Sequence, residues 1–271
     1  MNKILIKSPA KLNLYLKIIS KLSNNYHELD TRFQLIDLYD DLSFLSTKSK
    51  NISVKCSDPS IKEKDNIVYK TAILMQEINN GGGIDIDIKK VIPSGAGLGG
   101  GSSDAASTII MLNRLWEMNL SSEQMLDIGR RVGADVPFFI NGKNAHAFGV
   151  GDILKEIDSD MSNYIVIDPL IFNSTKAMFA EYSINNSYDS NSNIYQQNSF
   201  WNIFLDANKQ VKNFYKENIK KYEICLSGSG SAMFIKYNCD TEKEKILKII
   251  PTNWRFFEAK PLQYSPLLEF V

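Results

Sequence analysis

The sequence predicts a mixed fold of the α/β or α+β class, and three observations carry that prediction. Segments with the period-two alternation of strands take turns along the chain with segments of helical periodicity. The 271 residues, 44% of them hydrophobic, are enough for one large domain or two smaller ones. The chain has no long internal repeat, and a second half begins near residue 160. We therefore expect two units, residues 1–158 and residues 159–271.

The first predicted elements are two strands within residues 4–19, separated at Ser8-Pro9. In the second strand, apolar side chains alternate along one face: Leu12, Leu14, Leu16 and Ile18. The opposite face carries Lys11, Asn13, Tyr15 and Lys17. Because Lys11 and Asn13 share a face, both side chains can point into one cleft.

A helix, a strand and a second helix follow. An amphipathic pattern over residues 67–78 predicts the first helix, which begins after Asp65-Asn66 and ends before the glycines of 81–83. Alternation over residues 84–89 predicts the strand. A further apolar segment, from Asp104 to about residue 116, predicts the second helix.

A capping box predicts the next helix. In Ser121-Ser-Glu-Gln124 the serine and glutamine satisfy each other's backbone N–H groups, and the helix runs to Val132. Pro137 disfavours helical backbone at Val136, so we expect a break over residues 133–137.

The second half repeats the mixture of strands and helices. A strand is predicted over 164–167, a short helix over 176–182 with Ser174-Thr175 as its cap, and a helix over 200–218. The Asn- and Ser-rich residues 183–199 between the helices predict a loop. Residues 223–226, Ser227-Gly-Ser-Gly230 and residues 232–235 predict a strand, a tight turn and a strand.

The segment Pro93-Ser-Gly-Ala-Gly-Leu-Gly-Gly-Gly-Ser-Ser103 is the most informative motif in the chain. It holds five glycines and lies between a predicted strand and a predicted helix. Glycine adopts positive φ and lets backbone N–H groups approach a phosphate closely. The helix N-terminus adds unpaired donors and the positive end of its dipole. The segment therefore predicts a site for a phosphorylated ligand.

Three widespread phosphate-binding motifs do not fit this segment. Gly95-x-Gly97-x-x-Gly100 matches the dinucleotide pattern, but no strand ends near Glu117, where that pattern needs an acid. A Walker loop has a lysine directly after its last glycine, and this chain has none. A protein kinase carries His-Arg-Asp and Asp-Phe-Gly motifs, and neither occurs.

Composition narrows the class of protein and its partners. The formal net charge is zero, so the basic surface of a nucleic-acid-binding protein is not expected. We expect no signal peptide, because the chain enters a strand pattern after Met1, and no apolar run reaches the ~20 residues that a membrane span needs. Cys56, Cys225 and Cys239 lack metal-ligand spacing and predict reduced thiols. We expect a cytoplasmic protein that acts on a small molecule, not on nucleic acid or a membrane.

The glycine-rich segment, continued by Asp104-Ala-Ala, resembles the second motif of the GHMP small-molecule kinases. Ser8-Pro-Ala-Lys-Leu-Asn-Leu14 is similar to the first motif of that family, and Leu226-Ser-Gly-Ser-Gly-Ser231 to the third. The three motifs occur in the family's order over most of the chain. The resemblance implies a two-lobed α+β fold, with an N-terminal lobe like ribosomal protein S5 and a ferredoxin-like C-terminal lobe. It also implies ATP as the co-substrate and Mg²⁺ as the cofactor, while it names no protein ligand for the metal.

Three further segments resemble one branch of the family, the 4-diphosphocytidyl-2-C-methyl-D-erythritol kinases of the non-mevalonate isoprenoid pathway. They are Ala10-Lys-Leu-Asn13, Tyr26-His-Glu-Leu-Asp-Thr31 and Gly133-Ala-Asp-Val-Pro-Phe-Phe139. Two positions depart from the branch. Gly149-Val-Gly-Asp152 stands for Gly-x-Gly-Glu, and Asn198-Ser199 stands for Asn-Asp.

The resemblance assigns roles to two residues at the reacting atoms. Asp135 would be the general base that accepts the proton of the substrate hydroxyl. The residues alone favour a carboxylate that caps a turn, and the family motif reverses that preference. Lys11 would keep that carboxylate ionised and neutralise charge on the transferred phosphoryl group.

The remaining candidate residues bind the two substrates. ATP would contact Asn66, which is also a possible helix cap, and the segment Pro93, Ser94, Gly95, Ala96, Gly97, Leu98, Gly99, Gly100, Gly101, Ser102 and Ser103. Asn13 would orient the second substrate, a cytidine-diphosphate-linked methylerythritol. Tyr26 and Phe179 would stack on the two faces of its cytosine, and His27 would bind the cytosine edge. His146 has no such context and predicts a structural side chain.

Two further residues of the motifs admit more than one role. Asp104 is either a first-turn acid that favours the helix dipole or a residue that positions a metal. The Ser227–Gly230 turn either walls the site or forms a simple hairpin.

Two alternatives stay open. The chain could be another GHMP kinase, acting on mevalonate, homoserine or a sugar, although Tyr26-His27 would then have no cytosine to bind. It could also be a non-catalytic nucleotide- or RNA-binding module, against which the neutral charge and the Lys11/Asp135 pair argue.

Overall fold

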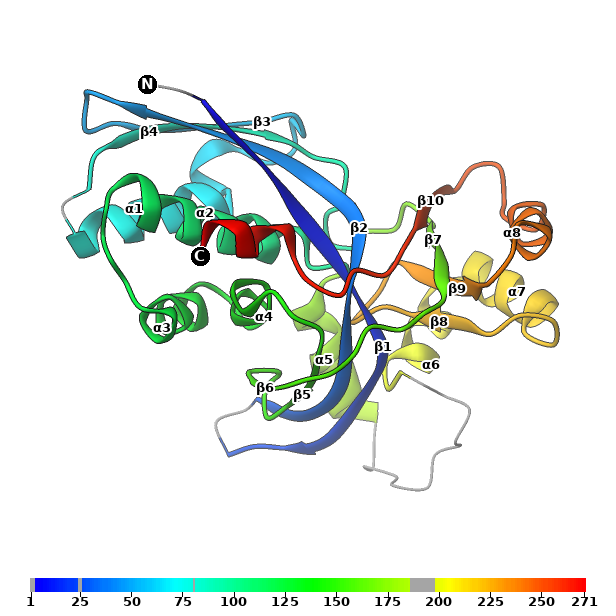
Figure 1. The fold of residues 1–271 in the computed structure, drawn as a ribbon. Helices are drawn as coiled ribbons and strands as arrows, with labels where there is room; N and C mark the ends of the chain where they lie inside the picture. Colours follow the sequence, from blue (N-terminus) through cyan, green and yellow to red (C-terminus); the bar gives the residue numbers. More distant parts are fainter. Residues whose placement is uncertain (1–2, 24–25, 80, 186–197) are drawn as a thin grey trace.

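The computed structural model describes residues 3–23, 26–79, 81–185 and 198–271. Its strands form two sheets, each covered by helices, and a long hairpin passes from one sheet toward the other (Figure 1).

The first sheet has the strand order β3-β4-β2-β5-β6, with β1 paired to β2. Its strands are β1 (Ile4–Lys21), β2 (His27–Thr47), β3 (Ile52–Cys56), β4 (Gly83–Lys89), β5 (Ala145–Phe148) and β6 (Ile153–Glu156). The β3/β4 pair is parallel, and the other pairs of this sheet are antiparallel.

Four helices pack with this sheet around one apolar core: α1 (Ile67–Asn79), α2 (Gly100–Leu115), α3 (Ser122–Val132) and α4 (Val136–Asn141). The predicted capping box opens α3, because Ser121 Oγ accepts from Gln124 N and Gln124 Oε1 accepts from Ser121 N. The 3₁₀ turn η1 (Glu63–Asp65) precedes α1.

The second sheet is antiparallel, in the order β10-β7-β9-β8. Its strands are β7 (Asn163–Asp168), β8 (Ile224–Leu226), β9 (Met233–Tyr237) and β10 (Arg255–Ala259). The helices of this part are α5 (Thr175–Asn185), α6 (Trp201–Ala207), α7 (Lys209–Asn218) and α8 (Asp240–Leu247). Alternating apolar residues of the sheet and these helices form a second core.

The β1–β2 hairpin contributes to every core of the protein. Near the chain's start Ile6 packs in the first core, and farther along β1 Leu16 packs in the second. Leu12 lies between them in a third cluster, with residues of the glycine-rich segment and of β7 and β9. This shared hairpin places the glycine-rich segment at the junction of the two lobes.

The division at residue 158 stays a prediction. The two sheets separate between β6 and β7, close to that position. However, the end of the chain returns to the first lobe: Leu262 N donates to Leu35 O, and Leu267 of η2 (Pro266–Phe270) packs in the first core. Figure 1 shows this red segment beside α2.

Several predicted boundaries were wrong. The two strands expected within residues 4–19 are one strand, because β2 pairs along its whole length and Pro9 sits at a register shift. The helix expected from Asp104 begins at Gly100, because Gly99 takes a left-handed conformation and serves as its N-cap. Pro137 separates α3 from α4 but lies in the first turn of α4, where a missing N–H is tolerated.

The C-terminal half also differs in detail. The helix expected over 200–218 is divided into α6 and α7, because Asn208 adopts extended backbone between them. Residues 183–185 continue α5, whereas 186–197, the bulk of the predicted loop, lie outside the described residues. Sequence reasoning did not predict β2, β3, β5, β6, β10 or α8. The strand–turn–strand prediction over 223–235 is confirmed.

Candidate active site

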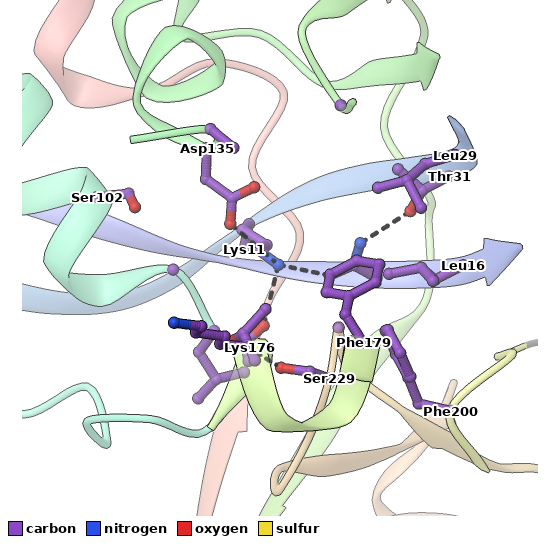
Figure 2. A pocket seen from close by; sticks show the side chains of 18 of the residues that line it. Lys11, Leu16, Leu29, Thr31, Ser102, Asp135, Lys176, Phe179, Phe200 and Ser229 are labelled. Carbon is purple, nitrogen blue, oxygen red and sulfur yellow. Dashed lines mark hydrogen bonds and ion pairs between the residues drawn. The ribbon is translucent and has the colours of Figure 1, made fainter. Parts of the chain in front are cut away.

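A cavity of ≈ 950 Å³ opens between the two lobes and is lined by residues of both. Its lining includes the glycine-rich segment, the middle of the hairpin, the residues before α4, one side of α5 and the β8–β9 turn. Figure 2 shows side chains from these elements converging on one space.

The glycine-rich segment forms a loop whose shape depends on the absence of side chains. Gly95, Gly97 and Gly99 all have positive φ. A Cβ on Gly97 would lie 2.1 Å from Ser227 O, and one on Gly99 would lie 2.8 Å from the Phe139 ring. These close approaches explain why glycine alternates through the loop.

The carbonyl groups of this loop are held by the surrounding protein. Gly97 O accepts from Lys11 Nζ and Ser227 Oγ, both at 3.0 Å, and Leu98 O accepts from Lys11 N at 2.9 Å. Ala96 O accepts from Ala232 N at 3.0 Å. By contrast, the backbone N–H groups of residues 94–102 donate to no acceptor within the described chain. The loop and the start of α2 thus present free donors, which is the arrangement that binds phosphate.

Lys11 is buried beside this loop. Its Nζ donates to Asn13 Oδ1 at 2.5 Å and lies 3.6 Å from Asp135 Oδ2. Burial lowers the pKa of Lys11, and the nearby Asp135 carboxylate opposes that shift. Because the ammonium is anchored from several sides, its position relative to Asp135 is well defined.

Among the described residues that line the cavity, Asp135 alone carries a carboxylate. It is the N-cap residue of α4, but its side chain makes no capping hydrogen bond. Its side chain is 34% exposed. The cap that sequence reasoning offered as the alternative is therefore absent, and the carboxylate faces Lys11 and the cavity (Figure 2).

Tyr26, His27 and Phe179 line the cavity together. The rings of His27 and Phe179 are stacked, with centroids 5.0 Å apart. Ser183 Oγ donates to Phe179 O, so it accepts from His27 Nε2, which leaves Nδ1 as the acceptor of the neutral ring. Burial and the charge of Lys21 lower the pKa of His27 and favour that neutral form. Tyr26 is exposed, and a base held between Tyr26 and Phe179 stays a prediction.

The β8–β9 turn forms another wall of the cavity, through Gly228 and Ser229. Asn198 holds this turn by donating from Nδ2 to Leu226 O and Gly228 O, both at 2.8 Å. Ser199, at one of the two departures from the branch pattern, accepts from Ile18 N at 3.0 Å and supports the hairpin. Gly228 and Ser229 therefore lie in the wall of the cavity, and the same turn joins the antiparallel strands β8 and β9.

Some predicted site residues do not line the cavity. Asn66 Oδ1 accepts from Val68 N at the start of α1, which is the capping role. Ser103 is buried, so Ser102 is the serine of the pair that lines the cavity. Asp104 does not line the cavity, and its Oδ2 accepts from Lys90 at 2.9 Å. His146 Nε2 is bonded to Asp30 and Tyr15, as expected for a structural side chain.

Sequence reasoning missed several lining residues. Thr31 lies within a recognised motif, and it accepts from Asn13 Nδ2 at 2.8 Å. Lys21 and Lys176 add positive charge to the cavity, but an isolated lysine carries no signal in a sequence. Phe200 packs edge-on against Phe179, with centroids 4.9 Å apart, and it was expected only as the start of a helix.

Comparisons with known proteins identify the family of this chain. The GHMP kinases N terminal domain matches residues 66–143. A 4-diphosphocytidyl-2-C-methyl-D-erythritol kinase of Acinetobacter baumannii is 38% identical, over 98% of this chain and 98% of the relative. One of Hahella chejuensis is 34% identical, over 97% and 95% of the two chains. The chain belongs to this family of GHMP kinases.

A solved structure is similar to the kinase throughout. A crystal structure of 4-(cytidine 5'-diphospho)-2C-methyl-D-erythritol kinase matches with a TM-score of 0.79 and 27% identity, over 95% of this chain and 99% of the other. A mevalonate kinase structure matches with a TM-score of 0.71 at 13% identity, over 95% and 99%, and shows the shared fold alone. The predicted two-lobed α+β fold is thereby confirmed. Membership of a kinase family also implies ATP as the co-substrate.

The described residues include no membrane-spanning helix and no cluster of metal ligands. No helix there has the length and apolar character to cross a membrane. No group of three or more His, Cys, Asp or Glu side chains in that part of the chain is arranged to hold a metal ion.

Proposed function

We propose that the kinase transfers the γ-phosphoryl group of ATP to the 2-hydroxyl of 4-diphosphocytidyl-2-C-methyl-D-erythritol, a step of isoprenoid precursor synthesis. One observation carries the proposal. A single cavity brings together three groups: the glycine-rich loop, the Lys11–Asp135 pair, and the side chains of Tyr26, His27 and Phe179. A donor, a proton acceptor and a nucleoside site are what this transfer needs.

ATP binds with its phosphates on the free N–H groups of residues 94–102. These donors and the N-terminus of α2 are held in place before the ligand arrives, so they need no reorganisation as negative charge moves to the leaving phosphate. Ser102 adds a hydroxyl at the same end of the cavity.

The second substrate places its cytosine at the opposite end. His27 accepts from the exocyclic amine of the base through Nδ1, and the Phe179 and Tyr26 rings contact its faces. Lys21 and Lys176 contribute positive charge for the diphosphate of the substrate. Asn13, fixed by Thr31 and Lys11, orients the sugar-alcohol part near Asp135.

Asp135 accepts the proton of the 2-hydroxyl while the oxygen of that hydroxyl forms a bond to the γ-phosphorus. The bond between that phosphorus and the β,γ-bridging oxygen breaks, and ADP leaves. Lys11, 3.6 Å from Asp135, stabilises the ionised carboxylate and the charge on the transferred group.

Mg²⁺ fits this site through the ATP phosphates. The ion takes oxygen ligands and usually binds through one or two protein groups, substrate phosphates and water. Ser102 and Asp135 both line the cavity. Because Asp135 is assigned as the base, Ser102 and the phosphate oxygens would hold the ion. When bound, it neutralises phosphate charge.

A substrate panel tests the proposal. Release of ADP is measured with the cytidylated methylerythritol, mevalonate or homoserine, and binding of CDP is measured by thermal shift. We expect turnover only with the cytidylated substrate and stabilisation by CDP. Turnover with mevalonate or homoserine instead, without stabilisation by CDP, would contradict the proposal.

Cytoplasmic location and reduced thiols at Cys56, Cys225 and Cys239 are part of the same proposal.

A further inference from the structure

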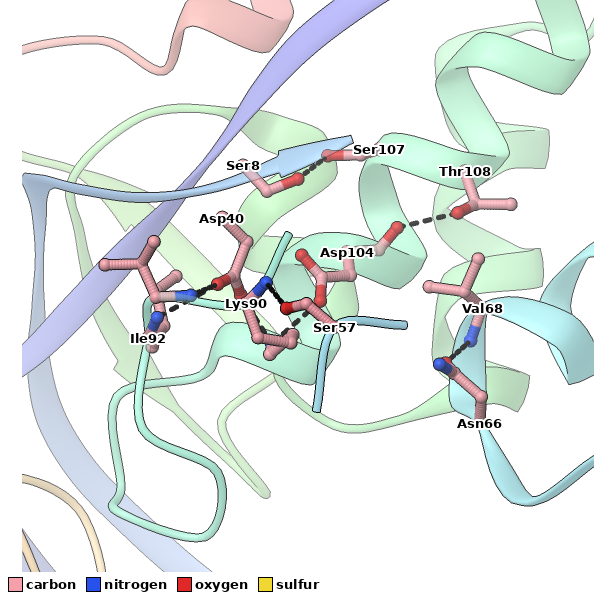
Figure 3. A network of polar contacts seen from close by, with 11 residues as sticks. Ser8, Asp40, Ser57, Asn66, Val68, Lys90, Ile92, Asp104, Ser107 and Thr108 are labelled. Atoms are coloured by element: carbon pink, nitrogen blue, oxygen red, sulfur yellow. Dashed lines mark hydrogen bonds and ion pairs between the residues drawn. The ribbon is translucent and has the colours of Figure 1, made fainter. Parts of the chain in front are cut away.

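A buried cluster of three ionisable side chains lies behind the glycine-rich loop (Figure 3). It consists of Asp40 of β2, Lys90 just after β4, and Asp104 in the first turns of α2. Lys90 Nζ lies 2.5 Å from Asp40 Oδ2 and 2.9 Å from Asp104 Oδ2. The described lining of the cavity contains none of the three, so the cluster does not reach the ligands directly.

The cluster joins the two ends of the loop. On the entry side, Asp40 Oδ1 accepts from Val91 N at 2.6 Å and from Ile92 N at 2.9 Å. On the exit side, Asp104 belongs to the helix that the loop opens. Lys90 connects these two sides, since its ammonium binds both carboxylates.

Gly100, the first residue of α2, packs closely against both Ile92 and Asp40. A Cβ on Gly100 would lie 2.8 Å from Ile92 Cγ2 and 3.3 Å from Asp40 Oδ2. The two ends of the loop, at Ile92 and Gly100, therefore lie next to each other beside Asp40. We infer that the cluster sets the distance between them.

Stability alone does not explain such a cluster. Two carboxylates and one ammonium out of water carry a large desolvation cost, and apolar side chains of the same volume often give a more stable protein. Burial lowers the pKa of Lys90, but Asp104 and Asp40 raise it above its ordinary range, so the ammonium stays charged. Directional bonds from a charged group fix geometry in a way that apolar packing does not.

We propose that Asp40, Lys90 and Asp104 are positioning residues that hold loop 93–99 in its phosphate-binding shape before ATP arrives. The inference rests on the proposed function only in taking the phosphates at this loop to be those of ATP. It makes a selective prediction, because the His27 and Phe179 end of the cavity has no described contact with the cluster. Loss of the cluster must weaken ATP binding and leave cytidine binding intact.

Asp104→Ala is the direct test, because it cuts the helix side and leaves a balanced Lys90–Asp40 pair. We expect KM for ATP to rise by about 10- to 100-fold, as for other displaced binding groups, while the Kd for CDP changes less than about twofold. Asp104→Asn keeps an acceptor oxygen for Lys90 and is expected to restore part of the ATP affinity. If Asp104→Ala does not fold, Asp104→Asn alone carries the comparison with wild type.

Thr108→Val is the matched control. Thr108 is buried on the same helix, and its hydroxyl donates to Asp104 O, one turn away from the loop. Its loss is expected to lower the Tm without changing KM for ATP. The inference is overturned if Asp104→Ala and Thr108→Val shift KM for ATP equally, or if ATP and CDP affinities fall together.

Calorimetry with ATP and with CDP separates this inference from the proposed function. Binding needs no turnover, so a wild-type protein that binds ATP but does not phosphorylate the cytidylated substrate refutes the function and still tests the cluster. If the wild type phosphorylates that substrate and Asp104→Ala binds ATP as tightly as the wild type does, the proposed role of the cluster is refuted and the proposed function is not.

Discussion

Replacing Asp135 with asparagine removes the proposed base and preserves the shape of the site. Asp135 makes no capping bond in α4, and Lys11 keeps its bonds to Asn13 and Gly97. General-base catalysis contributes about 10²–10⁴-fold to a rate, so kcat is expected to fall by that factor. The change corresponds to about 3–5 kcal/mol in the activation barrier.

The same substitution has a small expected effect on stability. Two charges 3.6 Å apart attract by about 4–5 kcal/mol at an effective dielectric constant of ~20. Because Asp135 is about a third exposed, solvent screening reduces the net contribution to about 1 kcal/mol. The Tm is therefore expected to fall by only about 2–4 °C.

The assay follows ADP release at saturating ATP and substrate, with Kd values for ATP and CDP from calorimetry. Asp127→Asn is the matched control, since Asp127 lies on α3, is exposed and pairs with Arg130. Its kcat should equal that of wild type. If Asp135→Asn kept a kcat within about threefold of wild type, while binding both nucleotides normally, Asp135 would not be the base.

Three further predictions concern the two ends of the cavity and the charge behind the loop. Phe179→Ala should weaken CDP binding by about 1–3 kcal/mol through lost stacking and leave the Kd for ATP unchanged, as calorimetry can show; equal losses for both nucleotides would contradict its assignment to cytosine. Gly97→Ala should abolish ATP binding, because its φ is +76° and the added Cβ would lie 2.1 Å from Ser227 O, whereas Gly82→Ala, whose Cβ would meet Trp116 at 3.4 Å, should bind ATP like wild type. Burial raises the pKa of Asp104 from 3.8 to about 7; the charge of Lys90 opposes this rise and the charge of Asp40 adds to it. Between about pH 4 and pH 7 the folded protein therefore keeps a proton on Asp104 that the unfolded chain has released, so the stability of the fold decreases as the pH rises. Urea titrations at about pH 5 and about pH 8 should show this loss in wild type and a smaller one in Asp104→Asn, and identical pH dependence in both would refute the assignment.

Local sequence predicted those features whose causes are local. The capping box before α3, the helix of residues 67–79 and the strand–turn–strand around Ser227 all depend on neighbouring residues, and the structure confirms them. The three motifs also identified the family, which the comparisons confirm. Long strand β2 was missed because the alternation of its buried side chains changes phase over residues 33–36, from odd to even positions, so no single period-two pattern runs through the segment.

The sequence by itself determined that a glycine-rich loop meets a helix N-terminus, and hence predicted a phosphate site there. Only the tertiary structure decided which groups share the cavity with that loop. The β1–β2 hairpin carries Lys11 under Gly97 and beside Asp135, and it sets His27 against Phe179 of the other lobe. The structure also placed Asp104 outside the lining of the cavity and in a buried ion cluster. These pairs are distant in the chain, so their contacts depend on how the two lobes pack and leave no local pattern to read.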